Sequence, residues 1–199
     1  MSDKLAAATH MGAVTLKVGD LDAMIRYYTE AVPLQLLSHA GPTATLGRGG
    51  VPVLVLVHTP ELRHAASGQA GLYHTAILFE TETALASAVA SVARRAPGTF
   101  TGSADHLVSK AFYFTDPEGN GVELYWDRAR TQWSWTHGQV EMDTLFLDPN
   151  QFLREHLSDP STEPDSIRAA RVGHVHLSVG DVSIARDFYV DRLGLAATL

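Results

Sequence analysis

The sequence predicts an α+β fold assembled from tandem β-α-β-β-β modules, and two observations carry this prediction. The spacing of hydrophobic residues is typical first of a strand, then of a helix, and then of three strands. This order occurs over residues 12–57 and again over 71–127. A stretch close to the N-terminus then recurs close to the C-terminus, as the start of a third module. Paired modules of this kind form half-barrels that can cradle a site between them.

In the first module, a strand is expected over residues 13–18 because apolar and polar residues alternate there. Asp20 is a natural N-cap, and the apolar residues that follow recur at helical spacing as far as Val32. Short strand-like pieces then cover residues 34–37, 43–46 and 51–57. The first module therefore reads as one strand, one helix and three strands.

The second module repeats this order. A strand is expected over residues 72–79 and a helix over 81–95, where Pro97 and Gly98 end it. Strands at 112–114 and 122–126 flank a tight turn at residues 116–121, which is rich in Asp, Pro, Gly and Asn. The middle strands of this module carry the weaker pattern.

The third module is legible as a repeat. Residues 12–38 align with 173–199 at a constant offset of 161, and 8 of these 27 positions are identical. We therefore expect a first domain at 10–127, a connector at 128–170 with linker composition at 159–165, and the start of a second domain at 171–199. Because a third module ending here lacks three strands, we expect the chain to be the front part of a longer protein.

The composition excludes several classes of function. Lys and Arg number 15 against 22 Asp and Glu, so the formal charge of −7 argues against a nucleic-acid groove and against an anionic membrane surface. With no cysteine, thiolate metal sites, disulfides and cysteine nucleophiles are excluded, whereas ten histidines are available as ligands. No apolar run reaches membrane-spanning length and no signal pattern opens the chain, so we expect a soluble, cytoplasmic protein.

The second module holds the densest cluster of functional residue types. Alternation puts His74 on one face of its strand, and Glu123 lies on the closing strand, on the face opposite Val122 and Leu124. A carboxylate in an apolar strand is costly to bury unless it is paired or bound to a cation. The two residues could bind a divalent metal, although a strand histidine is more often an ordinary core or rim residue.

The segment from His106 to Glu123 resembles the signature of the extradiol ring-cleavage dioxygenases, members of the vicinal oxygen chelate superfamily, which includes glyoxalases and bleomycin-resistance proteins. The matching parts are His106, Phe112-Tyr113, the Asp-Pro-Glu-Gly turn at 116–119, and Glu123, while Ala104 departs from the pattern. Residues 71–78 and 119–125 are similar to the bacterial catechol-2,3-dioxygenase group, whose members are longer. The β-α-β-β-β repeat is the superfamily's building block, so the resemblance covers residues 10–199.

The resemblance implies a non-haem Fe(II) site, with Mn(II) as the alternative metal. It implies that His74 and Glu123 are metal ligands, that His106 shuttles a proton, and that Tyr113 hydrogen-bonds the bound substrate. The implied substrates are a small aromatic diol, a catechol, and dioxygen. Two other functions share the scaffold: a metal-dependent glyoxalase-like lyase or isomerase, and a non-catalytic protein that binds an aromatic drug or metabolite. A homo-oligomer is compatible with each of these functions.

The third ligand is the open question. In the family a ligand histidine follows a glycine on the first strand of a module, but the first module has Ala13 there and the third has His174. His10 precedes the strand and is a poor substitute. We predict that His174 completes a site with His74 and Glu123; in the alternative, His174 belongs to a separate site whose other ligands lie beyond Leu199.

Overall fold

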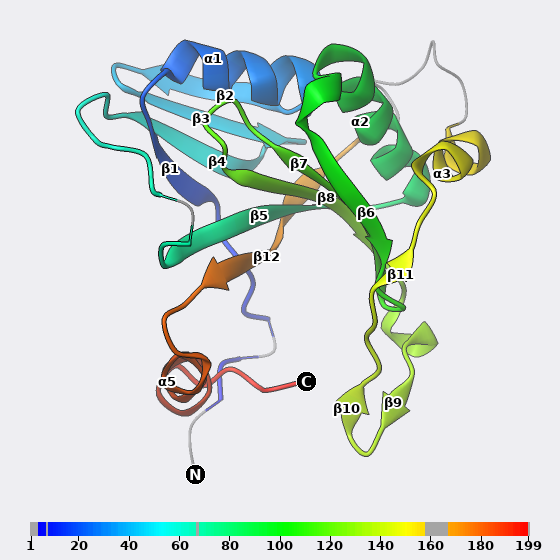
Figure 1. The fold of residues 1–199 in the computed structure, drawn as a ribbon. Coiled ribbons are helices and arrows are strands. Elements are labelled where there is room, and N and C mark those ends of the chain that lie inside the picture. The colour runs from blue at the N-terminus through cyan, green and yellow to red at the C-terminus, as the bar shows by residue number, and fades with distance from the viewer. Residues whose placement is uncertain (1–3, 7, 67, 158–166, 199) are drawn as a thin grey trace.

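A computed structural model describes residues 4–6, 8–66, 68–157 and 167–198 (Figure 1). Its main feature is one ten-stranded sheet, with helices α1 and α2 packed on one side. The elements of the first module are β1 (Val14–Val18), α1 (Leu21–Arg26), a π-helical turn (Tyr27–Ala31), β2 (Gln35–Ala40), β3 (Thr43–Arg48) and β4 (Val51–His58). Those of the second are β5 (Gly71–Phe79), α2 (Glu82–Arg95), a 3-10 turn (Pro97–Thr99), β6 (Phe100–Asp105), β7 (Ser109–Thr115) and β8 (Gly121–Asp127).

The remaining elements follow the second module along the chain. They are a 3-10 turn (Arg130–Gln132), β9 (Trp135–Thr136), β10 (Gln139–Val140), β11 (Leu145–Phe146), α3 (Pro149–His156), β12 (Ala170–Ser178), α5 (Val182–Arg186) and a π-helical turn (Asp187–Arg192). β9 and β10 form a separate hairpin, and β11 extends the sheet beside β6. Within the described residues, no helix is both long enough and apolar enough to cross a membrane.

The two complete modules have the same internal topology, which confirms the predicted α+β class. In the first, β1 pairs in parallel with β4, and β3 and β2 follow in antiparallel order. In the second, β5 pairs in parallel with β8, and β7 and β6 follow in antiparallel order. All three middle and closing strands of the second module are present despite their weaker sequence pattern.

The first helix differs from the expectation of one regular α-helix that ends at Val32. The α-helical hydrogen bonds stop at Arg26, and a π-helical turn takes over, with the Val32 N–H donating to the Tyr27 carbonyl. Pro33 follows and has no N–H to extend the helix, so the next bond runs from the Leu34 N–H to the Tyr28 carbonyl. This widened turn aims Tyr28 into the core, where its side chain is fully buried.

One hydrophobic core lies beneath the helices and joins both modules. Phe152 of α3 belongs to it, although α3 lies in the segment expected to be a connector. The linker expected at 159–165 lies outside the described residues, and the boundaries proposed for the domains stay a prediction. Beyond the linker, β12 enters the same sheet, antiparallel to β5. The first strand of the third module therefore lies directly against the first strand of the second.

Candidate metal centre

Three neighbouring strands bring the candidate ligands together around one small residue, Ala76. On β8, Glu123 lies opposite Ala76 in the parallel pair, and on β12 His174 lies opposite Ala76 in the antiparallel pair. His74 precedes Ala76 by two residues on β5 and therefore shares its face. Because the methyl group of Ala76 occupies little space, the three longer side chains can converge over it.

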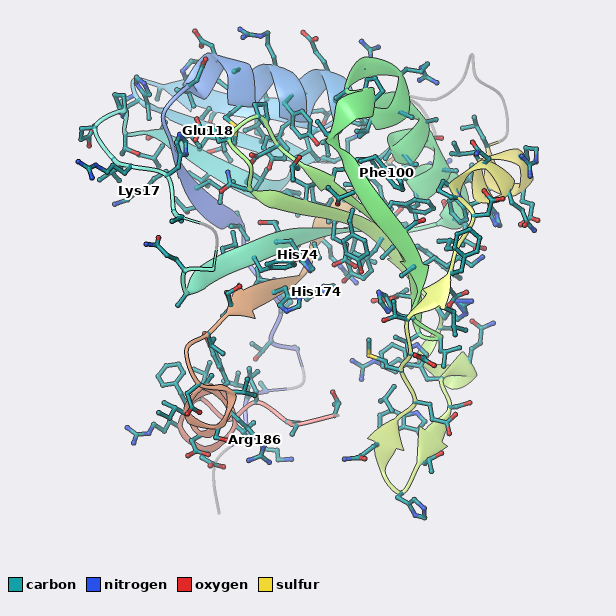
Figure 2. All side chains as sticks on the ribbon, in the orientation of Figure 1. Lys17, His74, Phe100, Glu118, His174 and Arg186 are labelled. Carbon is teal, nitrogen blue, oxygen red and sulfur yellow. The ribbon has the colours of Figure 1, made fainter. Side chains whose placement is uncertain are left out.

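The functional atoms of the cluster are within direct reach of one another. Glu123 Oε2 lies 2.8 Å from His74 Nε2 and 3.0 Å from His174 Nε2, and the potential ligand atoms of the three residues all lie within 4.8 Å of one another. Figure 2 shows the His74 and His174 side chains adjacent on β5 and β12. The side chains of His74 and Glu123 are 7% and 4% exposed, whereas that of His174 is 45% exposed. The cluster therefore has a buried floor and one open side.

Two glycines make this close approach possible. The pairing of β12 with β5 shifts register between Val172 and His174, a bulge at Gly173, and a β-carbon at Gly173 would collide with the Tyr125 hydroxyl. A β-carbon at Gly121 would collide with the backbone of Tyr73 and with His74. Gly121 thus lets β8 approach β5 next to His74, and the bulge at Gly173 sets the register that directs His174 toward Glu123.

The electrostatics of Glu123 suit a cation. Burial by itself would raise the pKa of its carboxyl, but the hydrogen bond from His174, the close contact with His74 and the positive charge of these two rings outweigh burial and lower the pKa to about 2. Glu123 is therefore ionised at neutral pH. Two imidazoles and one carboxylate are also a ligand set that suits Fe(II) and related divalent metals.

His74 provides a direct test of whether these residues fit a metal. Its buried Nε2 is close to Glu123, yet it makes no hydrogen bond within the described part of the chain. A buried nitrogen without a hydrogen bond is costly. A cation placed between this nitrogen, Glu123 and His174 would supply the missing partner, so the donor set and its geometry fit a divalent metal.

Tyr113 and His106 form a hydrogen-bonded pair next to the cluster. Tyr113 lies opposite Glu123 in the β7–β8 pair, and its ring is 5.8 Å from that of His74. The Tyr113 hydroxyl is 2.8 Å from His106 Nε2, and His106 Nδ1 is 2.9 Å from the Asp143 carbonyl oxygen. Because a carbonyl oxygen only accepts, Nδ1 carries the hydrogen, and Nε2 of the neutral ring accepts from Tyr113. Burial and the charge of Glu123 raise the pKa of Tyr113, so its hydroxyl stays protonated at neutral pH.

The structure thus brings all five predicted site residues into one region. His10 is not among them: it is exposed, and its Nδ1 is 3.1 Å from the Ala8 carbonyl oxygen. Sequence reasoning assigned no role to His176, whose ring lies 4.9 Å from that of His74 and 5.0 Å from that of Tyr73. The signal was available, because residues two apart on a strand share a face and His176 follows His174 by two.

Comparison with known proteins identifies the family of this chain. Residues 10–124, more than half of the chain, match the family model of the Glyoxalase/Bleomycin resistance protein/Dioxygenase superfamily. The chain belongs to this superfamily. It is also 33% identical over 191 residues, 94% of its length, to a catechol-2,3-dioxygenase of Bacillus subtilis, of which it spans 65%.

Solved structures support the glyoxalase/dioxygenase fold. A glyoxalase/bleomycin resistance protein/dioxygenase domain from Frankia has a TM-score of 0.50 and 22% identity, over 62% of this chain and 96% of that one. The cppA protein of Streptococcus pneumoniae has a TM-score of 0.52 and 13% identity, over 82% of this chain and 57% of that one. At these identities the likeness concerns the fold alone.

Proposed function

We propose that this chain carries the metal centre of an extradiol dioxygenase, in which His74, Glu123 and His174 hold Fe(II), or Mn(II), and a catechol is cleaved with dioxygen. The observation that supports it most is the convergence of two imidazole nitrogens on one buried, ionised carboxylate. The Bacillus relative, named as a catechol-2,3-dioxygenase, supports the choice of reaction. Bound Fe(II) would supply a Lewis acid with coordination positions left for the catechol oxygens and dioxygen.

Tyr113 and His106 have distinct parts in this proposal. The Tyr113 ring lies 5.8 Å from that of His74, and we assign its hydroxyl a hydrogen bond to a substrate oxygen that orients the substrate ring. His106 has Nδ1 committed to the Asp143 carbonyl and Nε2 to Tyr113, so it reaches the substrate only through the Tyr113 hydroxyl. A proton from the substrate hydroxyl would move to the Tyr113 oxygen while the Tyr113 proton moves to His106 Nε2. The imidazolium then formed keeps its Nδ1–H on the carbonyl.

To test this proposal, the protein is loaded with Fe(II) in the absence of oxygen, catechol is added, and air is then admitted. We expect oxygen uptake together with a yellow ring-fission product. The variant His174→Ala should abolish both, while His58→Ala, an exposed histidine of β4 outside the cluster, should leave both unchanged. Saturable catechol binding with no oxygen uptake would contradict the proposal and favour a binding protein. Oxygen uptake that survives His174→Ala would contradict the ligand set.

A further inference from the structure

The two candidate ligand histidines are held in different ways. The side chain of His74 is 7% exposed, whereas that of His174 is 45% exposed. Nε2 of His174 lies 3.0 Å from Glu123 Oε2, but its other ring nitrogen, Nδ1, makes no hydrogen bond with the described residues. A metal-binding histidine usually donates from that second nitrogen to an acceptor, which fixes the orientation of the ring. Another contact must therefore orient the imidazole of His174.

The contact available for this purpose is the ring of Tyr125. Its centroid lies 4.9 Å from that of the His174 ring, and the two planes make an angle of 64°. An edge-to-face arrangement of this kind is a favoured geometry for aromatic pairs. Among the described residues, the other ring in contact with His174 is that of His74, at 5.7 Å. Tyr125 therefore supplies the nearest ring surface against which His174 packs.

The sheet holds Tyr125 firmly in place. Tyr125 follows Glu123 by two residues on β8, so the two side chains share a face. It is paired with Leu78 of β5 and with Ala111 of β7, and it is 4% exposed. Burial and the nearby carboxylate of Asp127 raise the pKa of its hydroxyl, which therefore stays protonated at neutral pH. A buried, neutral side chain of this kind is suited to hold a neighbour in place.

The glycine before His174 fits against the same tyrosine. A β-carbon at Gly173 would collide with the Tyr125 hydroxyl, and it would lie 2.7 Å from the ring carbon Cζ. The φ angle of Gly173 lies outside the left-handed region, so its backbone conformation does not by itself require glycine. The requirement for glycine is the space that the tyrosine fills. Tyr125 thus lies against both the ring of His174 and the backbone of the residue before it.

We propose that Tyr125 is the positioning residue of the third ligand: its ring fixes the imidazole of His174, and its hydroxyl fills the space above Gly173. Nε2 of His174 then stays directed at Glu123 and at a metal held there. This role of Tyr125 rests on the proposed metal centre, to which it adds a residue that acts through His174. Without the ring, the exposed imidazole would gain rotational freedom, and ordering it again on metal binding would cost side-chain entropy.

The test compares two variants of Tyr125 in the whole chain by titration calorimetry with Mn(II). Tyr125→Phe keeps the ring and should bind Mn(II) about as tightly as the parent protein. Tyr125→Leu keeps an apolar side chain but removes the ring, so affinity should fall roughly 10–100-fold, the range for residues that support a ligand. The matched control is Tyr189→Leu, at a half-buried tyrosine outside the cluster, which should keep the parent affinity. Parent affinity in a folded Tyr125→Leu protein would overturn the proposal.

A second substitution tests the fit between Tyr125 and Gly173. Gly173→Ala should also weaken Mn(II) binding, because the added methyl group displaces either the Tyr125 side chain or the β12 backbone. In the Tyr125→Leu protein the same change should cost less affinity, since the hydroxyl and the Cζ atom that the methyl group meets are absent. Additive losses in this double-mutant cycle would contradict the interaction between the two residues.

Measurements on the metal-free protein separate the role of Tyr125 from the proposed function. Nuclear Overhauser cross-peaks between the ring protons of His174 and His74 should be present in the parent and in Tyr125→Phe, and they should be lost in Tyr125→Leu. A parent protein that binds no Mn(II) would contradict the proposed metal centre, while the cross-peaks would still decide whether Tyr125 orients His174. Unchanged cross-peaks in Tyr125→Leu would show that it does not.

Discussion

The first and second modules share one backbone plan but differ where the candidate ligands lie. Counting back seven residues from each helix cap, Asp20 or Thr81, leads to Ala13 in the first module and to His74 in the second. The parallel pairs then place Val55 of β4 where β8 has Glu123. One strand further, Thr45 of β3 stands opposite Val55, as Tyr113 stands opposite Glu123.

This difference teaches that the fold tolerates the ligand set without requiring it. Ala13, Val55 and Thr45 satisfy a β-strand as well as the functional residues do, because strand pairing depends on backbone groups and the other face supplies the core. The first module serves the second in another way. Its Tyr28, Gly19 and Asp20 anchor the turn between Tyr113 and Glu123.

The largest effect is expected at Glu123. The isosteric variant Glu123→Gln removes the negative charge, so affinity for Mn(II) or Fe(II) should fall by more than the roughly 10–100-fold typical of losing an outer supporting residue. Val55→Ala, at the equivalent place in the first module, should leave metal affinity unchanged. Titration calorimetry measures both. Full stoichiometric metal binding by the Glu123 variant would show that the metal binds elsewhere.

The next largest effect is expected at His106, where a substitution should impair proton transfer without impairing metal binding. We expect His106→Ala to retain metal while ring cleavage slows by roughly 10²–10⁴-fold, the range for losing a general acid–base. His39→Ala, on exposed β2 of the first module, is the control and should not change turnover. Steady-state oxygen uptake provides the measurement, and a parent rate in the His106 variant would rule out its assigned role.

An effect of the same size is expected at Tyr113. Because His106 reaches the substrate only through the Tyr113 hydroxyl, Tyr113→Phe removes the same relay, and ring cleavage should again slow by roughly 10²–10⁴-fold. Thr45→Val, its counterpart in the first module, should have no effect on turnover. Measuring kcat and KM separately shows whether the hydroxyl acts on substrate binding or later. If both variants slowed turnover equally, the proposed difference between the modules would be wrong.

The smallest effect concerns the anchor between the two modules. Tyr28→Phe leaves the buried Asp116 with its contacts to Asn120 but without the Tyr28 hydroxyl. The free energy of unfolding should fall by about 1 kcal/mol, seen as a lower denaturant midpoint. The half-buried equivalent in the third module, Tyr189, has no such bond to an acidic turn among the described residues, so Tyr189→Phe should leave the midpoint of the chain unchanged. A loss of the same size at both tyrosines would mean that the Asp116 bond is not the cause.

Local sequence patterns determine much of the secondary structure of this protein and indicate some of its candidate site residues. Alternating and helical periods give the order of elements, because burial of one face demands them. The side chains of Asp20, Thr81 and Asp181 cap their helices through bonds that span only three residues. Residue type also raises His74 and Glu123 as candidate ligands, since a carboxylate on an apolar strand is costly to bury without a partner. The family resemblance strengthens these two and adds His174.

Only the tertiary structure decided which strands meet. That β12 lies beside β5, 100 residues apart in sequence at His74 and His174, depends on edge pairing and on the bulge at Gly173. No local period encodes such a pairing, because every strand edge offers the same N–H and C=O groups and the choice follows from the packing of whole modules. For the same reason the sequence could not predict the hydrogen bonds that Glu118 accepts from Gly19 and Asp20, which join a turn of one module to the helix start of another.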